Sequence, residues 1–105
     1  MSMSYERIQI CGNIGSSEFL TSSQGTKYFQ LSVAVDRTVK DVKTTIWYKV
    51  LMFGAMGQDD SLLARYSKGR KVIVEGRPQF SAYKKLDGSP ALDSTIIAMV
   101  PPHLV

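Results

Sequence analysis

Large apolar residues alternate with small or polar ones along much of this chain, with a period of two. In residues 29–36 every odd position is large and apolar, and every even position is small or polar. A period of two predicts a strand with one face in a core and the other toward solvent. The sequence predicts further strands at residues 7–11, 46–53, 71–75 and 94–100.

Turn residues separate these strands. Gly25, in Ser-Gln-Gly, predicts a tight turn between the first two strands, and Asp87-Gly88 predicts a hairpin turn. We expect the first strand to end in the glycine-containing segment 12–15. The charged segment 38–45 predicts an exposed loop between the second and third strands.

One segment predicts a helix of two to three turns. Asp59 or Asp60 is a suitable cap, Leu62, Leu63 and Tyr66 share one apolar face, and Gly69 ends the pattern. The helix falls between the third and fourth predicted strands. Five strands with one helix at that place is the order of the OB-fold. The sequence therefore predicts an all-β fold, a five-stranded OB-fold barrel, as one domain over residues 1–105.

The charge balance of the chain indicates a polyanionic partner. The net charge is +4, and an excess of Lys and Arg attracts nucleic acid first and an anionic membrane surface second. No apolar run approaches the roughly 20 residues of a membrane span. The N-terminus lacks a signal peptide's apolar core, and the single Cys11 cannot form an internal disulfide. We expect a cytoplasmic protein without membrane contact, in which Cys11 is buried.

The sequence offers little for catalysis. His103 is the only histidine and lies in the last three residues, where we expect a mobile chain end. Cys11 therefore lacks a base, and no cluster has metal-ligand spacing. We read Asp59 and Asp60 as the start of a helix. The prediction is a protein that is not an enzyme and holds no metal or cofactor.

The segment 45–54 carries the most information about function. As a strand it places Trp47, Lys49, Leu51 and Phe53 on one face, and Tyr48, Val50 and Met52 on the other. A barrel strand needs one face for its core, so the second apolar face covers a partner subunit or a ligand. Aromatic rings separated by a cation suit single-stranded nucleic acid, because bases stack on the rings and the cation meets phosphate. In the competing interpretation, Trp47 and Phe53 are core residues and Lys49 reaches solvent at an edge.

A second candidate is the segment 77–85, a predicted hairpin arm with Phe80 and Tyr83 among three cations. Pro78 within it indicates an edge or a bulge, because proline cannot donate to a ladder. An ordinary solvated basic hairpin is the alternative interpretation. Other cations that could line a groove are Arg37, Lys40, Lys43, Lys68, Arg70 and Lys71.

With these residues laid out, the chain resembles the bacterial and phage single-stranded-DNA-binding protein family over nearly its whole length. Four motifs match in order, each at a plausible spacing. They are Gly-Asn-Ile-Gly at 12–15, Thr-x-Trp through Phe-Gly at 45–54, Tyr-x-Lys-Gly at 66–69 and Val-Glu-Gly-Arg at 74–77.

The resemblance implies an OB-fold homotetramer that binds single-stranded DNA without sequence preference in replication, recombination and repair. It implies a bacterial, plasmid or phage source. Family stacking positions fall on Trp47, Phe53 and Tyr83, and phosphate-contacting positions fall on Lys49, Lys68, Arg7 and Arg77. With the arm and loop cations, the predicted nucleic-acid-binding residues are Trp47, Phe53, Tyr83, Lys49, Lys68, Arg7, Arg77, Arg37, Lys43 and Lys84.

The chain also departs from the family pattern. Val39 stands where the family often has another stacking aromatic, and the family's acidic C-terminal tail is missing, so we expect no partners recruited through a tail. One alternative is a primosomal accessory OB-fold protein, which is usually dimeric. Others are an OB-fold used only for protein interaction, and RNA in place of DNA, because stacking platforms accept both sugars.

Overall fold

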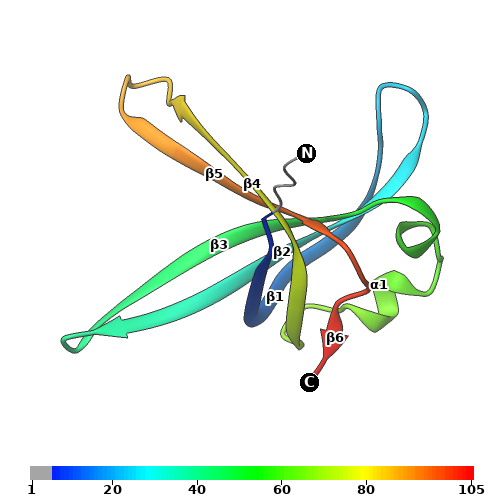
Figure 1. The fold of residues 1–105 in the computed structure, drawn as a ribbon, viewed down its shortest axis with the longest axis horizontal. Helices are drawn as coiled ribbons and strands as arrows, with labels where there is room; N and C mark the ends of the chain where they lie inside the picture. The colour runs from blue at the N-terminus through cyan, green and yellow to red at the C-terminus, as the bar shows by residue number, and fades with distance from the viewer. Residues whose placement is uncertain (1–5) are drawn as a thin grey trace, which may run out of the picture.

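A computed structural model describes residues 6–105 of the chain, apart from the side chains of residues 81, 83 and 90–92. Burial alternates along the strands inside the barrel. The strands are long and the helical segments are short (Figure 1). In chain order the elements are β1 (Ile8–Thr21), β2 (Lys27–Val39), β3 (Val42–Met52), the 3-10 helix η1 (Gly54–Gly57), α1 (Leu62–Arg65), β4 (Lys71–Lys84), β5 (Pro90–Ala98) and β6 (His103–Leu104).

The five long strands close into a barrel. Their neighbour order is β1-β2-β3-β5-β4, and β4 pairs again with β1. The β3–β5 pair is parallel, whereas the other pairs are antiparallel. β1 pairs with β4 from Ile8 to Asn13 and with β2 from Asn13 to Thr21, and the β1–β2 register shifts between Ile14 and Ser16. This closed five-stranded sheet, with α1 between β3 and β4, confirms the predicted OB-fold.

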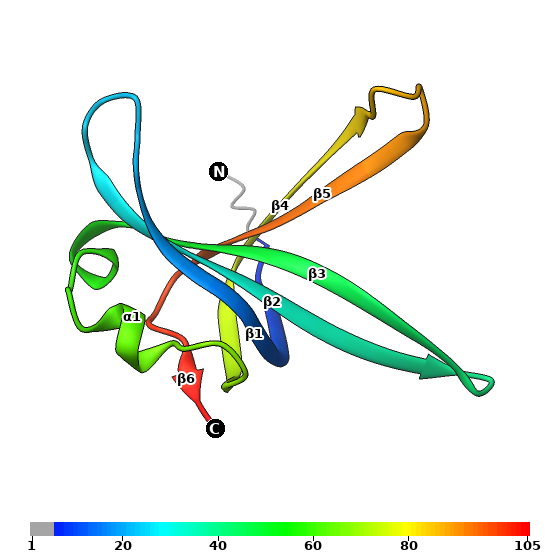
Figure 2. The same cartoon turned by 180° about the vertical axis from the view of Figure 1, so that it is seen from behind.

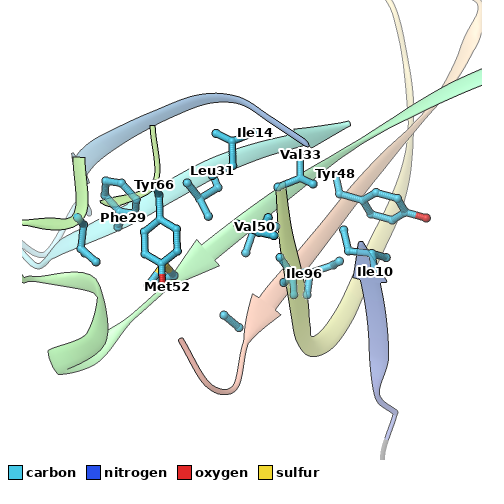
Figure 3. Close-up of a cluster of buried hydrophobic side chains, with 14 residues drawn as sticks. Ile10, Ile14, Phe29, Leu31, Val33, Tyr48, Val50, Met52, Tyr66 and Ile96 are labelled. Carbon is cyan, nitrogen blue, oxygen red and sulfur yellow. The ribbon is translucent and has the colours of Figure 1, made fainter. Parts of the chain in front are cut away.

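The core fills the inside of the barrel (Figure 3). On β2 the odd residues face inward, as the alternation predicts, and Phe29, Leu31 and Val33 are fully buried. The Phe29 ring packs edge-on against Phe19, with centroids 4.8 Å apart. Among the described residues, the buried apolar side chains of this core are Ile10, Ile14, Phe29, Leu31, Val33, Tyr48, Val50, Met52, Leu62, Tyr66, Val72, Val74, Ile96 and Ala98.

The prediction of a loop at residues 38–45 is wrong, because most of these residues are paired in strands. β2 and β3 continue as a hairpin arm to a two-residue turn at Lys40 and Asp41, both with positive φ, 50° and 65°. Such dihedrals are typical of tight two-residue hairpin turns, which are usually formed by Asn-Gly or Asp-Gly. Because Lys-Asp stands here instead, the sequence gives no hairpin signal at this turn. Beyond the barrel neither face of the arm is buried, so the period of two disappears from its sequence. Seen from both sides, this arm and the β4–β5 arm project in different directions (Figures 1 and 2).

Other strand boundaries also differ from the predictions. β1 does not stop at residues 12–15 but runs through them to Thr21, because its pairing passes from β4 to β2 at Asn13. Gly12 allows a close approach to β2, since a Cβ there would lie 2.3 Å from the Ala34 carbonyl oxygen. The predicted fourth strand and the separate arm at 77–85 are one strand, β4. Pro78 is tolerated because it lies beyond Gly76, the last described partner of β1, where one edge of β4 is free. β5 begins at Pro90 and ends at Ala98 rather than spanning 94–100.

The helix is one turn long rather than two to three. α1 covers only Leu62–Arg65, and Tyr66 leaves helical geometry at φ −105°, ψ 58°. The Tyr66 ring is buried, and its hydroxyl donates to the Pro102 carbonyl oxygen at 2.7 Å. Tyr66 thus ties the end of α1 to the segment that precedes β6.

Two smaller expectations are also wrong. The chain end is held in the sheet: His103 pairs with Ile73 in the β4–β6 ladder, and Pro102 is buried. Cys11 on β1 is exposed, because its neighbours Ile10 and Gly12 take the inward positions and Cys11 therefore faces outward.

Candidate nucleic-acid interface

The two faces of β3 have opposite surroundings. Tyr48, Val50 and Met52 are buried in the barrel. The alternate residues face outward: Trp47 is 55% exposed, and Phe53, which directly follows β3, is 40% exposed. Lys49 is exposed between them. The interpretation of Trp47 and Phe53 as core residues is therefore excluded, and the predicted division of β3 into two faces is confirmed.

The Trp47 indole has a seat made of small residues. Trp47 lies opposite Ala34 on β2, and Ala34 lies opposite Asn13 on β1. The ring extends over Gly15, where a Cβ would lie 2.5 Å from an indole carbon. Any larger residue at this position would push the ring away. The missing side chain at Gly15 thus lets one face of the indole lie against the sheet while much of the ring stays in solvent.

Phe53 has an aromatic neighbour that the sequence analysis missed. Tyr28 at the start of β2 packs against it, with ring centroids 5.1 Å apart and planes inclined by 38°. The register of Phe29 with Met52 places Tyr28 and Phe53 on the outer face. The sequence contains a signal for this neighbour: Tyr28 directly precedes the alternating segment 29–36, in which the even positions face outward, and Tyr28 is itself an even position.

Two cations share this outer face. Lys49 lies between Ser32 on β2 and Thr95 on β5. Arg77 lies opposite Ile97, which is itself beside Leu51 on β3. Both cations are exposed, and neither forms an ion pair with any carboxylate in the described part of the chain. Their charges are therefore available to an anion above the sheet.

Lys68 approaches the same face from the connection between α1 and β4. The Gly69 N–H donates to the Ile14 carbonyl oxygen at 2.8 Å, and the Asn13 side-chain amide donates to the Gly69 carbonyl oxygen at 3.3 Å. These bonds hold the exposed Lys68 beside the irregular part of β1, next to the Gly15 seat of Trp47.

Two of the predicted cations are already paired. The Arg7 Nε lies 2.9 Å from a Glu75 carboxylate oxygen, and the Lys43 Nζ lies 3.6 Å from Asp36. The hydrogen bond from the Thr45 hydroxyl, at 2.7 Å, lowers the pKa of Asp36, and Lys43 lowers it further. The carboxylate beside Lys43 therefore stays charged at neutral pH. A phosphate would have to compete with it for Lys43.

The remaining predicted residues lie on the arms. Arg37 is exposed on the β2–β3 arm, and Lys84 is exposed near the end of β4. The backbone of Tyr83 pairs with Ala91 on the β4–β5 arm, but its side chain lies outside the described residues. On the same arm Phe80 is 49% exposed. The structure thus gathers Trp47, Lys49, Phe53 and Arg77 on the barrel face, with Lys68 at its margin, and places Arg37, Lys43 and Lys84 on projecting arms.

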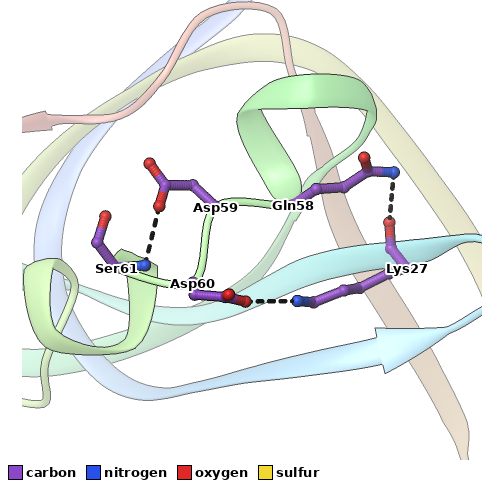
Figure 4. A network of polar contacts seen from close by, with 5 residues as sticks. All are labelled: Lys27, Gln58, Asp59, Asp60 and Ser61. Atoms are coloured by element: carbon purple, nitrogen blue, oxygen red, sulfur yellow. Dashed lines mark hydrogen bonds and ion pairs between the residues drawn. The ribbon is translucent and has the colours of Figure 1, made fainter.

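A polar network fixes the segment that follows Phe53 (Figure 4). The Gln58 side-chain amide donates to the Lys27 carbonyl oxygen at 3.3 Å, and the Lys27 Nζ lies 2.9 Å from Asp60. Asp59 accepts a hydrogen bond from the Ser61 N–H, which lowers the Asp59 pKa. The two acids thus close a turn and tie it to β2.

The described residues contain no cluster of three or more His, Cys, Asp or Glu side chains placed to hold a metal ion. Among the helices of residues 6–105, none has the length and apolar character needed to cross a membrane. The features that remain are an outward aromatic surface and unpaired cations. The fold and this face together define an OB-fold barrel with a stacking surface of the kind that binds unpaired bases.

Comparison with known proteins agrees with this class. The single-strand binding protein family matches residues 5–100, and the chain belongs to that family. It is 26% identical, over 93% of its length, to proteins named single-stranded DNA-binding protein from Xanthomonas campestris and Xanthomonas axonopodis. The chain spans 59% and 57% of the length of these relatives.

Solved structures show the same fold. A Plasmodium falciparum single-strand binding protein in complex with single-stranded DNA superposes with a TM-score of 0.71 at 19% identity, covering 100% of this chain and 98% of that one. The yeast mitochondrial single-stranded DNA binding protein Rim1 superposes at 0.66 with 25% identity, over 98% and 97% of the two chains. A small single-stranded DNA-binding protein from Streptomyces coelicolor gives 0.65 at 19% identity, over 93% of each chain.

Proposed function

We propose that this chain binds single-stranded DNA without sequence preference, and that it acts by binding alone. The observation that carries the proposal is the outer face of β3, where Trp47 and Phe53 are exposed with Lys49 between them. Every base has a π-face that can stack on an exposed ring, and a lysine can meet phosphate without reading sequence. The names of the Xanthomonas relatives support the same ligand.

The geometry favours single strands over duplex. In a duplex the bases are paired and stacked on one another, so they present no free face to Trp47 or Phe53. An unpaired strand can lay its bases on the rings and its phosphates toward Lys49 and Arg77. In the cell this activity would cover DNA exposed during replication, recombination and repair in the cytoplasm.

Fluorescence anisotropy with labelled oligo-dT tests the proposal. We expect binding that duplex DNA of equal length fails to displace and that weakens as salt rises, because phosphate contacts release counterions. Competition by oligo-rU measures the preference between DNA and RNA, since only the 2′-hydroxyl and the base methyl distinguish these two strands. Absence of binding in the folded protein would favour the alternative of an OB-fold used for protein contacts.

We further propose that the chain assembles into a homotetramer, with a dimer as the alternative. The family resemblance of the sequence supports this assembly. Light scattering measures it directly: a mass four times the 11.7 kDa of the chain is expected, and twice that mass would indicate the dimer.

A further inference from the structure

Tyr28 and Phe53 lie together at one end of the outer face, away from Trp47. We propose that Tyr28 is a base-stacking residue, and that with Phe53 it forms a second platform for one base of a single strand. This inference rests on the proposed function and adds a binding residue to the same face.

The Tyr28 and Phe53 rings are in contact and both reach the surface. Their centroids are 5.1 Å apart and their planes are inclined by 38°, so the two rings are in direct contact in a tilted arrangement. Phe53 is 40% exposed, and Tyr28 is partly exposed. Two rings in contact present more aromatic surface to a ligand than either ring alone, and the faces of aromatic rings attract stacked bases.

The Tyr28 hydroxyl adds a polar group that can bind a ligand. The Tyr66 hydroxyl is buried and donates to the Pro102 carbonyl oxygen. Within the described part of the chain, the Tyr28 hydroxyl has no such partner. It is therefore free to bond a base edge or a phosphate, which a phenylalanine could not do.

The surroundings hold Tyr28 in place before any ligand arrives. On one side of it, Lys27 is tied to Gln58 and Asp60 and its Nζ lies 4.1 Å from the Phe19 ring centroid. On the other side, Phe29 is fully buried. The backbone of Tyr28 is thus fixed by both neighbours and its ring already contacts Phe53, so binding a base would cost little ordering entropy.

The spacing along β3 makes this a separate platform. Phe53 follows Trp47 by six positions, which corresponds to roughly 20 Å along an extended strand. One base cannot span that distance. A single strand crossing the face would meet Trp47, then Lys49, and then the Tyr28–Phe53 pair.

Anisotropy titrations with oligo-dT test the proposal on three variants whose folding is checked by circular dichroism. Tyr28→Leu keeps apolar bulk against Phe53 but removes the ring, and we expect binding about five-fold weaker or more. Tyr28→Phe keeps the ring, so we expect affinity much closer to that of the wild type. Leu63→Ala is the matched control, because it removes an exposed apolar side chain on α1 (48% exposed) rather than on this face, and we expect wild-type affinity.

A reporter separates stacking from mere support of Phe53. In the double variant Trp47→Phe with Tyr28→Trp, the only tryptophan lies at position 28, and we expect oligo-dT to quench its fluorescence. Wild-type affinity of Tyr28→Leu would overturn the proposal. So would weaker binding by Tyr28→Leu without quenching in the reporter, which would leave Tyr28 as a support for Phe53. Failure of the wild type to bind oligo-dT would instead overturn the proposed function itself.

Discussion

The two faces of the β2–β3 sheet are built from similar residues but have different surroundings. The inner face carries Phe29, Leu31 and Tyr48, and the outer face carries Tyr28, Trp47 and Phe53. Inner rings are surrounded by the barrel, whereas the outer Trp47 ring lies over Gly15 and the outer Tyr28 and Phe53 rings contact each other. An aromatic residue on a strand therefore reveals its role only through its parity and through what lies opposite it. We expect substitutions on the inner face to change stability and those on the outer face to change binding.

The largest effect is expected on the inner face. Leu31→Ala removes a fully buried side chain that lies opposite Val50, and should lower the free energy of unfolding by about 2–5 kcal/mol. Urea denaturation followed by circular dichroism measures this loss. Affinity for oligo-dT, taken where the variant is still folded, should stay near that of the wild type. A binding defect with unchanged stability would break the comparison.

Trp47→Ala tests the outer face. Because the ring is 55% exposed, its removal should cost much less stability than Leu31→Ala. It should weaken binding to oligo-dT by about 1–3 kcal/mol, the range for losing one stacked base. Isothermal titration and urea denaturation of the same preparation give both quantities. Near-wild-type affinity in a folded variant would contradict the assignment of this face.

Gly15→Ala sharpens the comparison by leaving the indole present but removing its seat. The new Cβ would lie 2.5 Å from an indole carbon, so the ring must shift away from the sheet. We expect weaker binding than the wild type and stronger binding than Trp47→Ala. The change in tryptophan emission of the free protein reports the shift of the ring. An unchanged spectrum together with unchanged affinity would mean that the seat is unimportant.

The cations offer a matched pair. Lys49→Gln should reduce the slope of log affinity against log salt by about 0.7, the value for one phosphate contact with a single strand. Lys43→Gln should reduce it less, because the Lys43 Nζ already lies 3.6 Å from Asp36. Anisotropy titrations across a salt series give both slopes. Equal reductions would show that the ion pair does not compete with phosphate.

The smallest effect is a pH dependence on the β2–β3 arm. The hydrogen bond from Thr45 lowers the pKa of Asp36 below its ordinary value. A group with a lowered folded pKa stabilises the folded state above its unfolded pKa, and that contribution is lost as pH falls through the folded pKa. Thr45→Val should raise the Asp36 pKa toward the ordinary value. Carboxyl NMR titration of both proteins checks this, and an equal pKa in the two would refute the role of Thr45.

Much of the barrel could be predicted from the sequence, because its strands bury one face and so keep a period of two. The order of five strands and one helix, and the two faces of β3, follow from that signal. The same reasoning failed at residues 38–45, because the arm leaves the barrel and neither face is buried there. It also failed at His103, whose pairing with Ile73 depends on a contact with a distant strand.

The candidate site was predictable in part for the same reason. Parity along β3 identifies Trp47, Lys49 and Phe53 as one face, and the family resemblance supplies cations outside that strand. The neighbour of Phe53 and the seat of Trp47 depend on the register between strands, which pairs β3 with β2 and β2 with β1. The pairing of Lys43 with Asp36 likewise appears only when two strands are side by side. These features required the structure.

The central claim is that bases stack on the outer face of β3, and intrinsic fluorescence tests it most directly. Trp47 is the only tryptophan in the chain, so the signal comes from the proposed site itself. Titration with oligo-dT should quench this fluorescence strongly, and duplex DNA should neither cause nor reverse the quenching. Binding of oligo-dT with no change in Trp47 fluorescence would contradict the claim and place the DNA elsewhere on the barrel.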